Sequence, residues 1–293
     1  MSQHQIVIPT KDKLFNLGEF SLRRPGNMIT AVILVVGFVL TFIRFTQGIG
    51  SITNLSDTMP WGMWIGFDLL CGVCLAAGGY FTTVACYVMG MKHFHSAVRP
   101  AVTTAFLGYA FVVFALLYDL GHPLRLPYMF FFPGTTSVLF EVGLCVATYL
   151  TVLFIEFSVA PMEWLSCKFP FLKKWRKVVV RCTIILTIFG VCLSTLHQSS
   201  LGALYLHPLW YSPFMPMFFF VSSMAAGCSM VIFEGMWAHK GVHHYMDETH
   251  LREADEVVFS FSKAGAFILF GYFMLKLIDM LVQANLPYLC TGY

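Results

Sequence analysis

The chain has 293 residues, of which 58% are hydrophobic and only 11% are charged, and its mean hydropathy is +0.74. A typical soluble domain is about half apolar and about a quarter charged, so this composition excludes an ordinary soluble protein. The net charge of +3 is small and the basic residues are spread over several loops, which argues against a nucleic-acid partner. The composition indicates a polytopic membrane protein.

Seven apolar stretches are long enough to cross a hydrocarbon core of roughly 30 Å, which takes about 20 helical residues. In chain order, the predicted helices are 27–48, 64–91, 101–120, 136–158, 178–197, 214–238 and 257–283. The sequence therefore predicts an all-α polytopic membrane protein with a bundle of about seven transmembrane helices. Residues 1–26 lack the apolar core of a secretory signal and are predicted to be a cytoplasmic tail, followed by one transmembrane domain over 27–293.

Lysine and arginine are distributed unequally among the segments that connect these helices. The tail and every second loop contain Lys11, Lys13, Arg23, Arg24, Lys92, Arg99, Lys168, Lys173, Lys174, Arg176, Lys177, Arg181, Lys240 and Arg252. The alternate segments, 49–63, 121–135, 198–213 and the end from 284, contain only Arg125. Because positively charged loops stay on the cytoplasmic side, we expect a cytoplasmic N-terminus and an outward-facing C-terminal end.

Polar side chains concentrate toward the predicted outer ends of the helices. In chain order these are Arg44, Trp64 and Asp68 of "PWGMWIGFD", Asp119, Glu141, His197 with Gln198 and Ser199 of "STLHQSSLG", Lys276 and Asp279. The inner halves contain chiefly Glu156 and Glu234. A charge at the bilayer centre costs on the order of 3 kcal/mol, so several ionisable residues at one level indicate a site. Each one alone can instead be a snorkelling group or a hydrogen bond between helices.

Several other kinds of site are disfavoured by residue type and position. Of the ten histidines only His197 lies within a predicted helix, so a haem bound by two histidines is not expected. The nine cysteines lack the spacing of an iron–sulfur or metal site, and no metal site is predicted. A transporter site at the midplane is also disfavoured, because apart from Tyr109 the midplane is mostly apolar. Gly78 and Gly79 indicate close helix packing there instead.

Five blocks of sequence carry a resemblance to a known family. They are "PWGMWIGFDLLCGVCLAAGG", "VRPAVTTAFLGY", "SVLFE", "STLHQSSLGALYL" and "HPLWYSPFMPMFFFVSSMAAGCSMVIFEG". In this order they resemble the NrfD/PsrC family of integral membrane quinone-interacting subunits, over about residues 27–282. Within the family, the chain is most similar to the HybB-like subunits of nickel–iron hydrogenases and to the membrane subunit of the Hmc redox complex.

The resemblance implies a haem-free subunit in the bacterial inner membrane that binds menaquinone or ubiquinone near the periplasmic face. It implies electron exchange with a ferredoxin-like iron–sulfur subunit, which in turn connects to a hydrogenase, a molybdopterin enzyme or a multihaem cytochrome c. Family members usually have eight to ten helices, so C-terminal helices are expected to be missing from this chain. By motif, Asp68, Tyr109, Glu141 and His197 become candidates for quinone binding or proton transfer.

Quinone reduction takes two electrons and two protons, so its site needs hydrogen-bond donors and groups that pass protons. A histidine titrates near neutral pH and suits proton transfer. The hypothesis is that His197 hydrogen-bonds one quinone oxygen and that Gln198 and Ser199 orient it. Glu141, Asp68 and Tyr109 then form the proton path, and the residues expected to complete the quinone site are Trp64, Asp119 and Arg44.

Two alternatives from other classes stay open at this point. The chain can be a passive membrane anchor whose partner does all the chemistry, in which case the polar residues only join helices. It can also be an ion-translocating subunit, in which case Glu156 and Glu234 should connect to the outer polar residues.

Overall fold

The computed structural model describes residues 25–59, 62–91, 94–206, 211–242 and 248–285, and within these ranges helices are the regular elements. Seven helical spans in this part are long and apolar enough to cross a membrane, which confirms the predicted all-α polytopic fold. Residues 1–24 of the predicted cytoplasmic tail lie outside the described residues.

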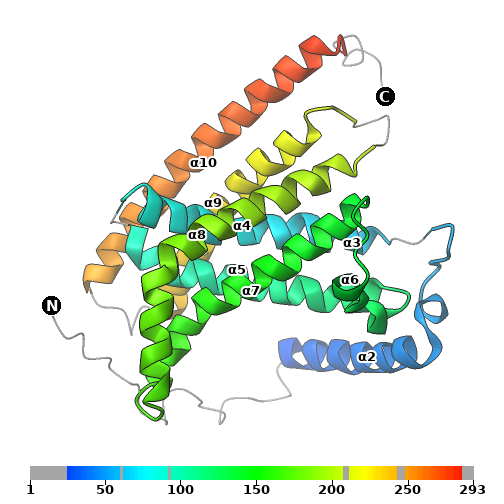
Figure 1. The fold of residues 1–293 in the computed structure, drawn as a ribbon, viewed down its shortest axis with the longest axis horizontal. Helices are drawn as coiled ribbons and strands as arrows, with labels where there is room; N and C mark the ends of the chain where they lie inside the picture. Colours follow the sequence, from blue (N-terminus) through cyan, green and yellow to red (C-terminus); the bar gives the residue numbers. More distant parts are fainter. Residues whose placement is uncertain (1–24, 60–61, 92–93, 207–210, 243–247, 286–293) are drawn as a thin grey trace. The chain divides into compact units, whose positions relative to one another are not determined.

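The elements follow one another along the chain as Figure 1 labels them. They are α2 (Pro25–Gln47), η2 (Ile49–Ser51), α3 (Met63–Phe67), η3 (Asp68–Val73), α4 (Cys74–Thr83), η4 (Val84–Val88), α5 (His95–Asp119), η6 (Pro123–Arg125), α6 (Tyr128–Phe131), α7 (Val138–Leu165), α8 (Phe171–Ala203), α9 (Met215–Val242) and α10 (Glu248–Val282). Residues up to Pro60 form one compact unit and residues from Trp61 form a second.

The first unit contains the apolar helix α2. Its threonines Thr30, Thr41 and Thr46 each donate their hydroxyl to the carbonyl four residues earlier. Each of these polar side chains is therefore satisfied within the helix itself, as a hydrocarbon environment requires.

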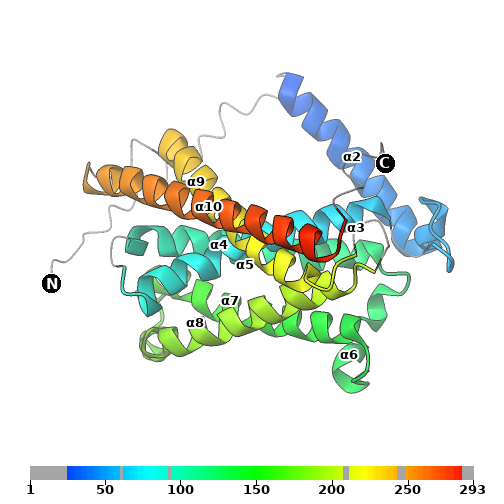
Figure 2. The ribbon, with the colours of Figure 1, turned by 90° about the horizontal axis from the view of Figure 1, so that it is seen from above.

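In the second unit, the span from α3 to η4 lies deepest in the bundle. Two of its four segments, η3 and η4, are π-helical, and 67% of its most apolar window is buried. Its central segment α4 packs against α5, α8 and α9, while α7 pairs with α8 and α9 pairs with α10 (Figure 2). None of the corresponding window of α10 is buried, so α10 is peripheral in this unit.

Glycines let α4 and α9 approach each other closely. A Cβ atom added to Gly78 would lie 2.7 Å from the Gly227 carbonyl oxygen, and one added to Gly227 would lie 2.5 Å from the Gly78 nitrogen. A Cβ on Gly79 would lie 2.5 Å from that of Ala105 on α5. The prediction that Gly78 and Gly79 mark close helix packing is confirmed.

The predicted end of the fifth helix is wrong. The prediction stopped at His197, but α8 begins at Phe171 and continues to Ala203. Its last turns are polar in sequence, yet Leu201 and Gly202 are buried, and a Cβ on Gly202 would lie 2.9 Å from the Met215 carbonyl oxygen. Packing against the start of α9 therefore keeps this segment helical.

Candidate functional site

His197 lies in the buried interior of the second unit, two turns before the end of α8. Its side chain is 1% exposed, and both ring nitrogens make hydrogen bonds. Nδ1 lies 2.6 Å from the Leu193 carbonyl oxygen, and Nε2 lies 2.6 Å from the Tyr109 hydroxyl. Because a carbonyl oxygen only accepts, Nδ1 must donate, so in the neutral ring Nε2 accepts and the Tyr109 hydroxyl donates.

Two tyrosines surround the His197 ring. Tyr109 of α5 is completely buried, and Tyr149 of α7 is 1% exposed. The two phenol rings meet edge to face with centroids 4.8 Å apart, and the Tyr149 centroid lies 5.7 Å from that of His197. The Tyr149 hydroxyl is buried and has no hydrogen-bond partner among the described residues. The three rings thus form one aromatic cluster from α5, α7 and α8 that keeps an unused hydroxyl in its interior.

Gln198 extends this polar interior toward α9. Its side-chain nitrogen donates to the Ser194 hydroxyl at 3.1 Å, and its side-chain oxygen accepts from the Ser223 hydroxyl. Ser194 and Ser223 are fully buried and Gln198 is 2% exposed. The amide and both hydroxyls are satisfied by one another, which lets them stay in an apolar bundle.

Glu141 lies beside the next turn of α8 rather than against His197. Its carboxylate accepts a hydrogen bond of 3.1 Å from the Ser200 hydroxyl, so it joins the outer ends of α7 and α8. Ser199 is half-buried and makes no side-chain hydrogen bond among the described residues. Glu141 is therefore one helical turn along α8 from the His197 cluster.

The remaining predicted site residues are distributed over other positions. Asp119 at the end of α5 is 8% exposed and accepts a hydrogen bond from the Trp64 indole nitrogen. Asp68 is half-buried at the first residue of π-helical η3, and no hydrogen bond connects it with His197. Arg44 is 2% exposed, but it belongs to the first unit. Of the predicted residues, the structure places Tyr109 and His197 in direct contact.

The aromatic cluster offers hydrogen-bonding chemistry that suits a quinone carbonyl. A phenol hydroxyl can donate to such an oxygen, and the unused hydroxyl of Tyr149 is a donor of this kind. His197 can donate or accept directly only if Tyr109 or Leu193 gives up its hydrogen bond. The residues therefore fit a quinone head group better through the tyrosines than through the imidazole.

Sequence reasoning missed Tyr149, Ser194 and Ser223. Tyr149 lies eight residues after Glu141, and Ser194 lies three residues before His197, so both share a helix face with a residue that the sequence analysis singled out. That spacing could have identified them. Ser223 lies in an apolar stretch of α9 and only its contact with Gln198 sets it apart from other serines.

No group of three or more metal-binding side chains occurs in the part of the chain that the structure describes. The free cysteines of this part are distributed over several helices, as expected from their spacing.

Comparison with known proteins matches residues 51–284 to the family model described as "Polysulphide reductase, NrfD". A protein of Nitratidesulfovibrio vulgaris strain Hildenborough is 67% identical over 280 residues, which cover 93% of this chain and 71% of that protein. The probable Ni/Fe-hydrogenase 2 b-type cytochrome subunit of Escherichia coli K12 is 36% identical over 225 residues, 73% of this chain and 56% of that protein.

The integral membrane subunit of menaquinone reductase from the same Nitratidesulfovibrio strain is 30% identical over 172 residues. The aligned part is 58% of this chain and 40% of that subunit, so the chain spans between two fifths and about seven tenths of these relatives. No solved structure matches the chain.

Proposed function

Because the chain belongs to the polysulphide reductase NrfD family, we propose that it is the membrane subunit of a respiratory redox complex. In this proposal it binds menaquinone or ubiquinone near the periplasmic face of the bacterial inner membrane. It exchanges electrons between the quinone pool and a periplasmic iron–sulfur or cytochrome partner. The relatives named as a hydrogenase subunit and as a menaquinone reductase subunit support this assignment.

The observation that carries the proposal is the buried hydrogen bond between Tyr109 and His197, with Tyr149 packed against both rings. A histidine and two phenols have no need to be joined inside an apolar bundle for packing alone, since burying polar groups is costly. The pair can hold a proton between two atoms, and the unused Tyr149 hydroxyl can bind an oxygen of a substrate.

The residues of this chain then divide the proton work as follows. Tyr109 donates its proton toward a substrate oxygen, and a protonated His197 returns a proton to the Tyr109 oxygen through Nε2. The Leu193 carbonyl keeps Nδ1 protonated throughout and holds the ring in place. His197 in this scheme acts through Tyr109, while Glu141 and Ser200, one turn away on α8, supply the exchange of protons with the outside.

The electrons must come from a partner subunit at the same end of the bundle. We assign no haem or iron–sulfur cluster to this chain, because His197 already uses both ring nitrogens. The outer ends of α3 and α5, which Trp64 and Asp119 join, are the part of the second unit to which this proposal assigns the partner.

The test uses the intact purified complex with the variants His197→Ala, Tyr109→Phe and Glu141→Gln. Each should abolish quinone-coupled turnover, because each removes a group that holds or passes a proton. Activity with a soluble dye that bypasses quinone should stay normal and thereby report assembly. Tyr128→Phe, an exposed tyrosine of α6, is the matched control. Normal quinone turnover in His197→Ala and Glu141→Gln would reject these roles.

A second candidate function is ion translocation, and one seam of side chains favours it. On α7, Tyr149, Glu156 and Glu163 are spaced by seven residues, which is about 10 Å along the helix. The Thr187 hydroxyl of α8 donates to the Glu156 carboxylate at 3.3 Å, and Ser194 lies seven residues further along α8. The seam therefore extends from the Tyr149 cluster toward the inner end of α7 and α8.

Glu234 provides a control for this candidate, because it lies on a different face. It accepts from the Thr104 hydroxyl and lines a cavity between α5, α9 and α10. In proteoliposomes, Glu156→Gln should lower proton uptake per electron while turnover in detergent stays normal, and Glu234→Gln should change neither. Equal proton uptake in Glu156→Gln and the unsubstituted protein would remove ion translocation along this seam.

A further inference from the structure

Basic residues are concentrated where α7 turns into α8. The segment from 168 to 181 contains Lys168, Lys173, Lys174, Arg176, Lys177 and Arg181. After Glu163 the sequence has no aspartate or glutamate until Glu234. This end of the bundle consequently has a large excess of positive charge that its own sequence does not balance.

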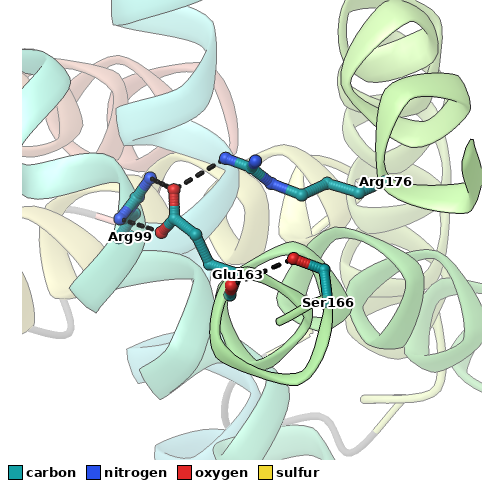
Figure 3. Close-up of polar contacts among 4 residues, drawn as sticks. All are labelled: Arg99, Glu163, Ser166 and Arg176. Atoms are coloured by element: carbon teal, nitrogen blue, oxygen red, sulfur yellow. Dashed lines mark hydrogen bonds and ion pairs between the residues drawn. The ribbon is translucent and has the colours of Figure 1, made fainter. Parts of the chain in front are cut away.

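Glu163 is the acidic residue that meets this segment, and two arginines already share it. Its carboxylate lies between the guanidinium groups of Arg99 of α5 and Arg176 of α8, at 2.9 Å and 2.6 Å (Figure 3). Ser166 donates to the backbone carbonyl of Glu163, which ties the end of α7 to the same place. The three charged groups together keep a net charge of +1, so the cluster does not neutralise the lysines beside it.

The start of α8 adds a second positive contribution. The N-cap residue Pro170 makes no side-chain cap, and the first turn of the helix contains no acidic residue. The exposed side chains of Lys173, Lys174 and Lys177 lie within the first two turns. A helix N-terminus carries a partial positive charge that attracts anions and repels cations, so this placement is unfavourable unless an anion is present.

Aromatic side chains accompany the cations. Phe169 is 58% exposed, Phe171 is 75% exposed and Trp175 is 46% exposed, and beyond Arg181 α8 becomes an apolar span. Aromatic residues next to such a span lie at the level of the lipid head groups. The lysines of the same turns are then at the depth of the lipid phosphates.

We propose that the α7–α8 turn, residues 166–181, binds the head group of an anionic phospholipid in the adjoining leaflet. Lys173, Lys174 and Lys177 contact the phosphate together with the free N–H groups at the start of α8, and the exposed aromatic side chains contact the acyl chains. Arg99 and Arg176 keep their contacts with Glu163 and position the turn. The site is independent of the proposed quinone chemistry.

The test measures binding of fluorescent phosphatidylglycerol to the purified full-length complex in detergent. A triple variant, Lys173→Gln with Lys174→Gln and Lys177→Gln, should bind at least tenfold more weakly, since each cation near an anionic surface contributes about fivefold. Binding of the matched phosphatidylcholine probe should not change. Raising the salt concentration should weaken phosphatidylglycerol binding to the unsubstituted protein.

The matched control removes the same charge from the N-terminal tail by Lys11→Gln, Lys13→Gln and Arg24→Gln. An equal loss of binding in this control would show general electrostatic attraction and overturn the proposed site. Displacement of the lipid probe by millimolar inorganic phosphate would assign the site to free phosphate, and unchanged binding in the lysine triple variant would remove it. Labelling of Cys167 from the same side of the membrane checks that the lysine substitutions have not inverted the chain.

Discussion

At the scale of single residues, the hydrogen bonds of His197 determine which atom can move a proton. The Leu193 carbonyl fixes the proton on Nδ1, so Nε2 is the atom that changes protonation, and its partner is the Tyr109 hydroxyl. Both side chains are sealed from solvent by the bundle. The histidine is therefore a proton store for the tyrosine rather than a group that reaches a large substrate directly.

The Tyr109→Phe variant should lose this bond and little else. A buried hydrogen bond contributes about 1 kcal/mol, so the free energy of unfolding should fall by about that amount while the fold stays intact. Thermal denaturation of the purified protein in detergent measures the change. A loss of secondary structure in this variant would mean that the bond has a larger structural part than assigned here.

The Tyr149→Phe variant separates a structural from a functional hydroxyl. This hydroxyl is buried without a partner, so its removal should leave stability unchanged or raise it by up to about 1 kcal/mol. If the hydroxyl binds a quinone oxygen, quinone turnover of the complex should nevertheless fall at least tenfold. Unchanged turnover together with raised stability would reduce Tyr149 to a packing residue.

At the scale of the elements, the contact between α4 and α9 depends on Gly78 and Gly227. Their backbones come so close that either Cβ would overlap backbone atoms of the opposite helix. This close approach brings α9, with Ser223, against α8 and its Gln198. The buried amide network thus rests on two glycines that carry no polar group themselves.

Gly227→Ala should therefore destabilise the bundle by about 1–3 kcal/mol, the usual cost of overpacking a core. Gly271→Ala on α10 is the matched control, because a Cβ atom there meets nothing within 4 Å. Thermal denaturation should show a lower Tm for the first variant and an unchanged or slightly higher Tm for the second. The same Tm for both would show that α4 and α9 can separate without loss.

At the scale of the whole molecule, the charge distribution predicts the orientation in the membrane. Cys167 is exposed at the basic turn between α7 and α8, whereas Cys290 belongs to the C-terminal end and lies outside the described residues. The turn should face the cytoplasm and the C-terminal end should face outward. The two cysteines thus serve as natural markers for opposite faces.

A membrane-impermeant maleimide should label Cys167 in inverted vesicles and not in intact spheroplasts. A Cys290→Ser variant simplifies the measurement, and a Cys167→Ser variant should show the opposite pattern through Cys290. Labelling of Cys167 in intact spheroplasts would reverse the orientation. It would also move the proposed lipid site to the outer leaflet.

The cofactor content is a second property of the whole molecule. The Escherichia coli relative is named as a b-type cytochrome subunit, whereas both ring nitrogens of His197 are already hydrogen-bonded in this chain. The chain produced without partners should show no haem band in its reduced minus oxidised spectrum. A stoichiometric haem that disappears in His197→Ala would contradict this and reassign the histidine as a ligand.

The sequence by itself determined the fold class, the number of spans and their approximate positions. These properties depend on transferring about 20 successive side chains into hydrocarbon, a cost that adds up along the chain without reference to neighbouring helices. For the same reason the close glycine packing at Gly78 and Gly79 could be predicted, because small residues in an apolar span have few other uses.

Only the tertiary structure decided which polar residues meet. Tyr109 and His197 are 88 residues apart, and their contact depends on how α5 and α8 turn their faces toward each other. The same packing continues α8 past His197 to Ala203, gives Glu141 to Ser200, and adds Tyr149 to the cluster. The helices are set by local hydrophobicity, but the hydrogen bonds of the candidate site are set by packing between helices, which the hydrophobic pattern of a single chain does not encode.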